Sequence, residues 1–230
     1  HGENMLKKRL KLIYNMIPNC KVISDIGTDH ALLPAFALIN GKCVKAIACD
    51  VRKGPLKRAK ETVNQFSLND KMELRLGDGL EPILEEEVDT IVIAGMGGQL
   101  IAEILDKSIS KAKRANNIIL QPMTKQGFLR VFLWKHGFEI LDEALAKEGE
   151  KLYQVLKVRY TGTIRKAWEP INEIIGEKLI EKKDPFLSEW ITAAIQKQEK
   201  VVEGLKVANT SDETLNMATE LLMNLKKLLN

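Results

Sequence analysis

The feature that most constrains the fold is a regular alternation of short apolar runs with segments of helical periodicity. Five runs that are partly β-branched are separated by helical patterns, and they occupy residues 21–26, 44–49, 72–76, 88–94 and 117–121. Strands that alternate with helices predict a parallel sheet, because right-handed crossovers place helices over both faces. The pattern therefore predicts an α/β protein with a doubly wound, mostly parallel sheet.

The rhythm changes after Gly137. Residues 138–147 and 151–160 both have the composition of strands, and only Glu148, Gly149 and Glu150 separate them. This spacing predicts a β-hairpin, which brings the expected sheet to seven strands. A doubly wound, Rossmann-like sheet closed by a hairpin is the architecture of class I methyltransferases, whereas dehydrogenases with a dinucleotide-binding sheet usually lack that ending.

Helical patterns also flank the predicted sheet. Apolar residues at helical spacing predict an amphipathic helix over residues 4–17 that ends at Pro18. Beyond Tyr160, two long helical faces are joined by a turn at 209–212, where Thr210 and Glu213 have the spacing of a capping box. The first face is predicted at Phe186, Trp190, Ala194, Val201 and Leu205, and the second, with 3,4 spacing, at Leu215, Ala218, Leu222, Leu225 and Leu229.

This tail is interpreted as an antiparallel helical hairpin, similar to a coiled coil. The predicted domains are residues 1–162, a methyltransferase domain with its N-terminal helix, and residues 163–230, a helical domain. Two functions remain open for the hairpin: an arm that grips a partner, or a structural hairpin that docks on the domain or dimerises. A monomer is the favoured state.

Composition narrows the class of protein. Apolar residues make up 45% of the 230 residues and charged residues 29%, and no run approaches the roughly 18 uncharged residues of a membrane span. The sequence thus predicts a globular protein without membrane attachment. Cys20, Cys43 and Cys49 fit neither a disulfide framework nor a zinc site, so we expect reduced thiols, no bound metal and a cytoplasmic location. No signal peptide is expected at the start.

Charge is distributed unevenly along the chain. Residues 1–164 carry 25 Lys and Arg against 20 Asp and Glu, while residues 165–230 carry 10 against 11. Basic side chains form two clusters in the first part: Lys7, Lys8, Arg9 and Lys11, and then Arg52, Lys53, Lys57, Arg58 and Lys60. Such runs are often solvated helix faces, but two clusters in one domain favour a polyanionic partner.

The first predicted strand ends in Asp25-Ile-Gly-Thr-Asp-His30, where open parallel sheets bind ligands. A dinucleotide loop would read G-x-G-x-x-G so that its amides could approach the pyrophosphate closely. Only Gly27 remains of that pattern, and Asp25 and Asp29 flank it. Two carboxylates repel phosphates, but they suit a ligand that carries an ammonium and a sulfonium group. The loop therefore favours S-adenosylmethionine.

Two further acidic residues lie at strand ends. Asp50 closes the second strand, followed by Val51, at about the offset where a carboxylate accepts hydrogen bonds from both ribose hydroxyls. Asp78, next to Gly79 after the third strand, could meet the adenine amino group. Each Asp alone is weak support, because Asp is common in turns, but three at successive strand ends form a specific pattern.

The fourth strand ends in Ala94-Gly95-Met96-Gly97-Gly98, where the target atom should meet the methyl group. The glycines let backbone and substrate approach closely, and Met96 packs either on the cofactor or in the core. The chain lacks the Asn/Asp/Ser-Pro-Pro-aromatic tetrapeptide that accepts hydrogen bonds from an exocyclic amine, and it lacks the Pro-Cys of pyrimidine C5 methylation. A ring nitrogen or a hydroxyl group is left as the target.

Taken together, these motifs resemble the bacterial tRNA (adenine-N1)-methyltransferase family that modifies adenosine 22. The resemblance rests on Asp25 to His30 with Ala31 and Pro34, on Gly77 to Leu80, on Ile93 to Gly98 and on Leu120 to Pro122. It covers the whole chain, including the C-terminal hairpin. The family implies a class I methyltransferase domain, S-adenosylmethionine as donor and tRNA as acceptor.

The expected chemistry assigns roles near the acceptor. Methylation of adenine N1 makes the ring cationic, and the Asp29 carboxylate could stabilise this charge and accept an N6 proton. His30 either positions the base or is an ordinary loop residue. Gln121, next to Pro122, could read adenine through its amide, and Tyr153 could stack on the flipped base.

Contacts with tRNA are expected from basic residues: Arg9, Arg52, Lys53, Arg58, and also Lys125 and Arg130. Two alternatives remain. An enzyme with another RNA or a small molecule as acceptor would keep the fold, although five basic residues within 52–60 argue against a neutral metabolite. A non-catalytic adaptor that binds nucleotide or tRNA has no reason to retain three aspartates at strand ends.

Overall fold

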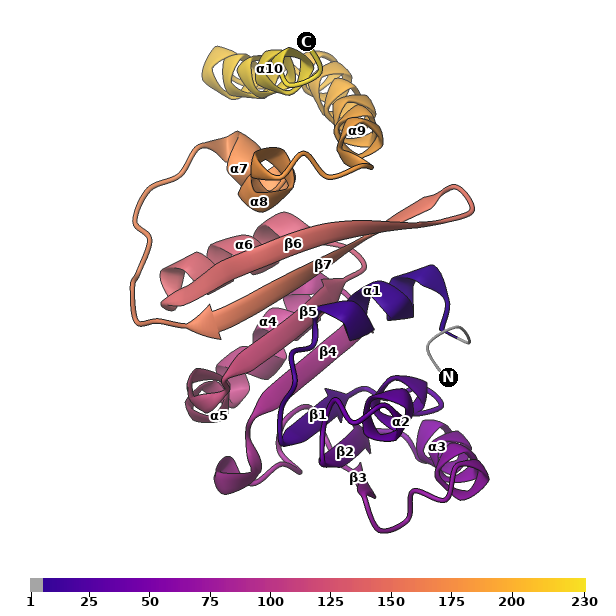
Figure 1. The fold of residues 1–230 in the computed structure, drawn as a ribbon. Helices are drawn as coiled ribbons and strands as arrows, with labels where there is room; N and C mark the ends of the chain where they lie inside the picture. The colour runs from indigo at the N-terminus through magenta and orange to yellow at the C-terminus, as the bar shows by residue number, and fades with distance from the viewer. Residues whose placement is uncertain (1–5) are drawn as a thin grey trace. The chain divides into compact units, whose positions relative to one another are not determined.

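The computed structural model describes residues 6–230, and the chain divides into two compact units, His1–Lys166 and Ala167–Asn230 (Figure 1). The described part of the first unit holds one seven-stranded sheet in the order β3-β2-β1-β4-β5-β7-β6. Neighbours from β1 to β5 pair in parallel, while β7 is antiparallel to both β5 and β6. The predicted doubly wound, mostly parallel sheet with a terminal hairpin is confirmed.

The strands lie close to their predicted positions. They are β1 (Val22–Ile26), β2 (Lys45–Asp50), β3 (Met72–Leu76), β4 (Thr90–Met96), β5 (Asn117–Pro122), β6 (Phe138–Glu148) and β7 (Lys151–Tyr160). β4 continues past residue 94 because a bulge there lets pairing resume between Met96 and Pro122. Gly95 occupies this bulge with φ +76°, a conformation that glycine adopts without strain.

The strand order places a topological switch point between β1 and β4. The chain runs outward from β1 to β2 and β3, and it then returns to the other side of β1 with β4 and β5. Loops after β1 and β4 consequently leave the sheet in opposite directions and open a crevice at its carboxyl edge. This crevice is where an open α/β sheet binds its ligand.

Helices cover both faces of the sheet (Figure 1). One face carries α1 (Lys8–Met16), α2 (Leu32–Ile39) and α3 (Lys53–Gln65), and the other carries α4 (Gly98–Lys107), α5 (Ile109–Arg114) and α6 (Gln126–Lys135). A short 3-10 helix, η2 (Glu85–Glu87), precedes β4. Strand side chains alternate between two buried clusters: Ala46 and Ala48 belong to the first, Ile47 and Cys49 to the second.

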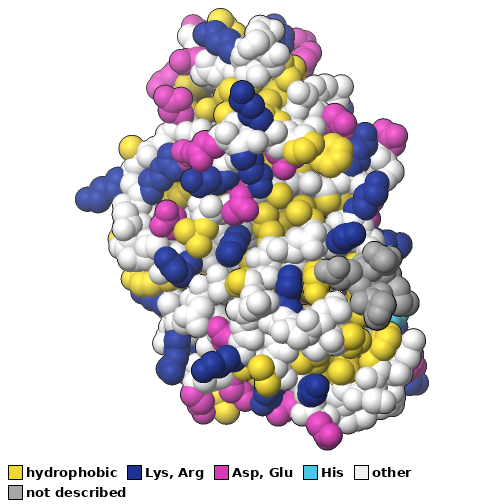
Figure 2. Space-filling view, in the orientation of Figure 1, with side chains coloured by type: hydrophobic (Ala, Val, Ile, Leu, Met, Phe, Trp, Pro, Cys, Tyr) yellow, Lys and Arg dark blue, Asp and Glu magenta, His cyan; other side chains and the backbone are white. Residues whose placement is uncertain are grey.

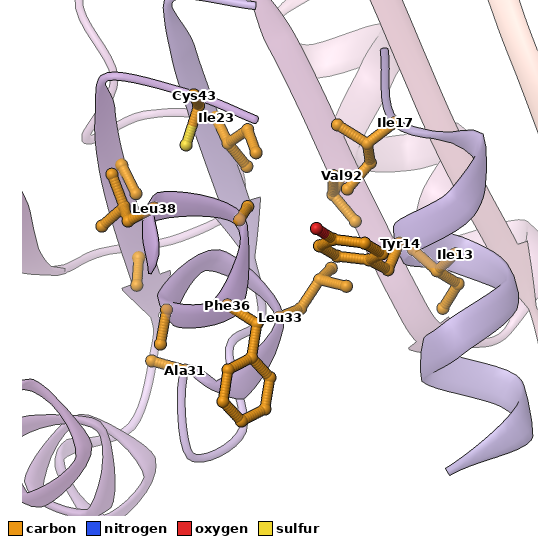
Figure 3. Close-up of a cluster of buried hydrophobic side chains, with 14 of the residues drawn as sticks. Ile13, Tyr14, Ile17, Ile23, Ala31, Leu33, Phe36, Leu38, Cys43 and Val92 are labelled. Atoms are coloured by element: carbon orange, nitrogen blue, oxygen red, sulfur yellow. The ribbon is translucent and has the colours of Figure 1, made fainter. Parts of the chain in front are cut away.

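The N-terminal helix is an integral part of the first cluster. Ile13 and Tyr14 of this helix, and Ile17 directly after it, belong to the same buried cluster as Leu33 and Phe36 of α2, and each is at most 4% exposed. Figure 3 shows the Tyr14 ring facing Leu33. Burial of each large side chain contributes about 1.5–3 kcal/mol. The predicted helix over 4–17 is thus present from Lys8 to Met16, and its residues 4 and 5 lie outside the described part of the chain. α1 is held firmly against the sheet.

The second unit contains α7 (Pro170–Ile174), α8 (Glu177–Glu181), α9 (Leu187–Val207) and α10 (Asp212–Lys227). α9 and α10 pack against each other as the predicted hairpin. The buried stripe of α9 differs from the predicted face, because it consists of Ile191, Ile195, Gln198 and Val202, while Val201 is exposed. Gln198 Nε2 donates to the Ala218 carbonyl oxygen at 3.0 Å, so a polar side chain occupies a central position of this interface.

The ends of the hairpin also show details that the sequence did not reveal. Ser211, rather than Thr210, caps α10, and its hydroxyl accepts a hydrogen bond from the Thr214 amide at 3.3 Å. The predicted domain boundary at residue 162 falls in the segment 161–169, which contains no helix or strand. Among residues 6–230, no helix has the length and apolar character needed to span a bilayer.

Candidate active site

A cavity of about 290 Å³ opens at the carboxyl ends of the first four strands. Every predicted cofactor residue except Asp25 lines it: Gly27, Asp50, Val51, Asp78, Gly79, Ala94, Gly95 and Met96. The lining also includes Arg52, Ile26, Cys49, Gly77, and Leu100 and Ile104 of α4. Sequence analysis missed the last two, although their spacing of four residues places them on one helix face. Together they give the cavity an apolar wall.

Asp50 presents a carboxylate to the cavity. The residue is only 5% exposed, and its Oδ1 accepts a hydrogen bond from the Arg52 amide at 2.8 Å. Its other oxygen, Oδ2, has no hydrogen-bond partner among residues 6–230. This oxygen can accept hydrogen bonds from a ligand.

Asp25 stabilises the loop after β1 and does not line the cavity. Its Oδ2 accepts a hydrogen bond from the Thr28 hydroxyl at 2.8 Å, and the residue is 8% exposed. Burial raises the pKa of Asp25 to about 6, against the opposing effect of the Thr28 hydrogen bond, and the negative charges of Asp50 and Asp29 raise it further. A cationic ligand nearby would favour the ionised carboxylate.

The loop after β1 is fixed by its backbone. The amides of Gly27 and Thr28 both donate to the Cys49 carbonyl oxygen, at 2.9 and 2.8 Å. Gly27 has φ +77°, and a Cβ at this position would collide with Cε of Met96. Met96 therefore packs on the loop, at the edge of the cavity.

The loop after β3 carries Asp78 and is anchored by Arg75. Both terminal nitrogens of Arg75 donate to Glu87, at 2.6 and 2.7 Å, and Nη1 also donates to the Pro82 carbonyl oxygen at 2.9 Å. The Arg75 hydrogen bonds lower the pKa of Glu87 to about 2. The Asp78 carboxylate is exposed, and Lys107 Nζ of α4 lies 3.3 Å from it.

Asp29 and His30 lie together outside the cavity lining. His30 Nε2 is 3.6 Å from Asp29 Oδ1, and Arg58 Nη2 of α3 is 3.5 Å from the same oxygen. Both predicted catalytic side chains are exposed, Asp29 by 72% and His30 by 51%. His30 and Ala31 have positive φ values of 58° and 53°, so consecutive non-glycine residues adopt the left-handed conformation at the start of α2.

Residues predicted to face the acceptor come together from distant segments. The amide oxygen of Gln121, on β5, accepts hydrogen bonds from the Gly95 amide at 3.0 Å and from Arg9 Nη1 at 2.9 Å. Gln121 is fully buried, and both lone pairs of its oxygen are thereby used. The Arg9 guanidinium lies 5.9 Å from the centre of the Tyr153 ring on β7. Gln121 thus connects the cavity residue Gly95 to Arg9, and Tyr153 lies next to Arg9.

The glycines after β4 have a packing role. The Gly98 amide donates to the Thr124 carbonyl oxygen at 2.7 Å, and a Cβ on Gly98 would collide with the Lys125 carbonyl oxygen. At Gly97, an added Cβ would meet only the Thr124 hydroxyl, at 3.1 Å. The Met123 amide, next to Pro122, donates to the Met96 carbonyl oxygen at 2.8 Å. These contacts join the ends of β4 and β5 tightly.

Most of the predicted tRNA contacts are exposed, but Arg9 is half-buried and Arg130 is buried. The side chains of Arg52, Lys53, Arg58 and Lys125 are exposed, whereas the prediction for Arg130 is wrong. Arg130 is fully buried, and its Nη2 donates to Glu143 Oε1 of β6 at 2.6 Å, so it cannot reach RNA. Figure 2 shows Lys and Arg side chains spread over the drawn face, with acidic side chains between them.

Comparisons with known proteins agree with this architecture. A family model described as a methyltransferase domain matches residues 6–156. The tRNA (adenine(22)-N(1))-methyltransferase of Bacillus subtilis (strain 168) is 36% identical over 225 residues, which make up 96% of this chain and 94% of that protein. The crystal structure of the B. subtilis tRNA methyltransferase TrmK superposes with a TM-score of 0.84 at 33% identity, covering 98% of this chain and 99% of that chain.

A further solved structure contains a bound ligand. The Sp1610 protein of Streptococcus pneumoniae, in complex with S-adenosyl-L-methionine, has a TM-score of 0.81 at 31% identity and covers 98% of this chain and 100% of its own. The similarity extends through both units, because the alignments span nearly the whole chain. This chain therefore belongs to the family of tRNA (adenine(22)-N1)-methyltransferases.

Proposed function

We propose that this chain transfers the methyl group of S-adenosylmethionine to N1 of adenosine 22 in tRNA. One observation carries the proposal. In a chain of this family, the cavity at the switch point combines a buried carboxylate that has an open oxygen with a glycine bulge at the end of β4. The first feature suits a ribose, and the second leaves room for an acceptor to approach.

The residues around the cavity fit S-adenosylmethionine. Asp50 Oδ2 can accept hydrogen bonds from ribose hydroxyls, and Leu100 and Ile104 offer apolar surface to a purine ring. Gly27 leaves backbone accessible, and the nearby carboxylates of Asp25 and Asp29 favour a cationic ligand. When bound, this cofactor supplies an electrophilic methyl group.

Little activation of the acceptor is required. The N1 lone pair of adenine is free at neutral pH, so the protein has to position the base and stabilise the charge that develops on the ring. We assign the stabilising role to Asp29, which can also accept an N6 proton directly or through water. His30 positions the base, and Arg58, 3.5 Å from Asp29, orients the carboxylate.

Exposed basic side chains on two helices support binding of a nucleic acid backbone. Lys7, Lys8 and Lys11 lie on or before α1, and the second cluster, from Arg52 to Lys60, lies at the start of and along α3. Each neutralised phosphate releases counterions, so affinity should fall with salt. We also propose that the protein acts as a monomer, and a tRNA substrate favours a cytoplasmic location.

The test uses unmodified tRNA transcripts. The protein is incubated with labelled S-adenosylmethionine and either a transcript with adenosine at position 22 or a matched transcript with guanosine there. We expect 1-methyladenosine in the nuclease digest of the first transcript alone. Label in both transcripts, or in a different nucleoside, would contradict the proposed target.

A further inference from the structure

Arg9 differs from the other basic residues of its cluster, because its guanidinium lies beside the cavity. Nη1 donates to Gln121 Oε1 at 2.9 Å, and it would lie 3.8 Å from a Cβ built on Gly95, a residue of the cavity lining. The Arg9 backbone amide donates to Glu148 Oε1 at 2.9 Å. Side chain and backbone are therefore held at two separate points, on β5 and on β6.

The charge of Arg9 has no counterion within the described chain. Among residues 6–230, no carboxylate oxygen lies within 4.0 Å of its guanidinium, and the group to which it donates is a neutral amide. Two other partly or fully buried arginines are paired with carboxylates: Arg75 pairs with Glu87 at 2.6 Å, and Arg130 pairs with Glu143 at 2.6 Å. A half-buried cation that has hydrogen bonds but no counterion gains stability when an anion joins it.

Gln121 fixes this cation without neutralising it. The same oxygen accepts the Gly95 amide and Arg9, so the bulge at the end of β4 and the guanidinium are tied to one buried atom. A guanidinium has five N–H donors, and one hydrogen bond from its terminal nitrogens is present here. The remaining donors form a planar fork that matches an oxyanion.

We propose that Arg9 binds an oxyanion that a substrate carries into the site, and that Gln121 is the positioning residue that holds Arg9 for it. This inference rests on the proposed function. Two substrate groups have the required chemistry: the carboxylate of the amino acid part of the cofactor, and a phosphodiester next to the target nucleotide. Lys11, exposed on the same helix, has no side-chain hydrogen bond or ion pair within the described chain and provides the matched control.

The first experiment compares Arg9→Gln with Lys11→Gln, since both remove one positive charge from α1. Calorimetry measures binding of S-adenosylhomocysteine and of 5′-methylthioadenosine, which lacks the amino acid. If the anion is the carboxylate, Arg9→Gln weakens binding of the first by at least tenfold and leaves the second unchanged. If the anion is the phosphodiester, Arg9→Gln leaves the affinities for S-adenosylhomocysteine and 5′-methylthioadenosine unchanged. The single-turnover rate of Arg9→Gln with tRNA, at saturating cofactor, then falls at least tenfold further than that of Lys11→Gln.

Gln121→Glu gives an independent test. This change puts a carboxylate against Arg9, so the guanidinium is neutralised and is no longer available to a substrate oxyanion. For Gln121→Glu we expect the same loss of binding or rate as in Arg9→Gln and an unchanged melting temperature. For Arg9→Lys, which keeps the positive charge, we expect partial activity. Full activity of Gln121→Glu, or equal behaviour of Arg9→Gln and Lys11→Gln, would overturn the proposal. Calorimetry of ligand binding does not require methylation of tRNA. It still tests the role of Arg9 if the wild-type protein methylates no tRNA, so failure of this inference can be distinguished from failure of the proposed function.

Discussion

The two halves of the candidate site are assembled in different ways. The cofactor half uses residues at or just after the ends of β1, β2 and β3, such as Gly27, Asp50 and Asp78. The acceptor half joins Arg9 of α1 to Gln121 of β5, which is 112 residues away in the chain, and places Tyr153 of β7 beside them. The first half depends on short loops at strand ends, while the second depends on how helices and strands pack.

Backbone hydrogen bonds explain why the cofactor half is so local. The Gly27 amide donates to the Cys49 carbonyl oxygen at 2.9 Å, and the Gly77 amide donates to the Asp50 carbonyl oxygen at 2.9 Å. Each loop is thus attached to the neighbouring strand by the same ladder that orders the sheet. In the acceptor half, side chains make the connections, so changes in packing should affect it more strongly.

The largest expected effect concerns the packing of the acceptor half. Gly98→Ala should lower the free energy of unfolding by about 3 kcal/mol, because the new Cβ meets the rigid Lys125 carbonyl group. Gly97→Ala is the control, since the Thr124 side chain can rotate away, and we expect a loss below about 1 kcal/mol. Urea unfolding of both variants measures the difference. Equal stability would mean that the ends of β4 and β5 are not tightly packed.

The next effect is on turnover. Asp29→Asn keeps the size of the side chain and removes its charge, so turnover should fall roughly 100-fold while tRNA affinity changes little. Single-turnover kinetics and a gel shift measure the two quantities. Near-normal turnover would exclude a catalytic role for Asp29, and loss of cofactor binding alone would place it in the cofactor half.

Asp50 tests the cofactor half directly. Asp50→Ala should weaken S-adenosylmethionine binding by about 1–3 kcal/mol, the loss expected for hydrogen bonds to a charged acceptor. The exposed Asp78 carboxylate faces Lys107, so Asp78→Ala should weaken binding less than Asp50→Ala does. Calorimetry on both variants gives the ranking, and the reverse order would assign the main polar contact to the loop after β3.

The buried carboxyl of Asp25 makes stability depend on pH. Its pKa is about 6 in the folded chain and 3.8 in the reference state, so the folded state binds the proton more tightly. Stability should therefore fall by about 1–2 kcal/mol as pH rises from about 4 to about 6. Asp25→Asn, which retains an acceptor for Thr28, should lack this fall. Denaturation curves at several pH values compare the two proteins, and parallel pH profiles would contradict the assignment.

The smallest effect is expected at the surface. Lys107→Ala removes an ion pair in which both side chains are more than half exposed, so stability should change by about 0.5 kcal/mol or less. Cofactor affinity should change less than about twofold for the same reason. A larger loss of affinity, measured by calorimetry, would show that Lys107 holds Asp78 in place for the ligand.

Several differences from expectation share one origin. The periodicity of α9 indicated a helix but did not identify its buried face, because Trp190 and Ile191 are both apolar and only packing against α10 selects between their stripes. Arg130 has the charge expected of an RNA contact, but in the folded chain Glu143 of β6 lies 2.6 Å from it. Residue type alone could not distinguish these outcomes.

Local sequence patterns determine the helices and strands of this protein, because apolar runs and turn residues encode where each one begins and ends. The aspartates at the strand ends indicate the cofactor half of the candidate site. These signals are short in range, so they can be read without knowing the fold. Tertiary structure alone decided the partners. The Gln121 side-chain oxygen accepts hydrogen bonds from Arg9 and Gly95, and Arg130 has a buried counterion. Each of these roles depends on a residue that only the packed sheet brings within a few ångströms.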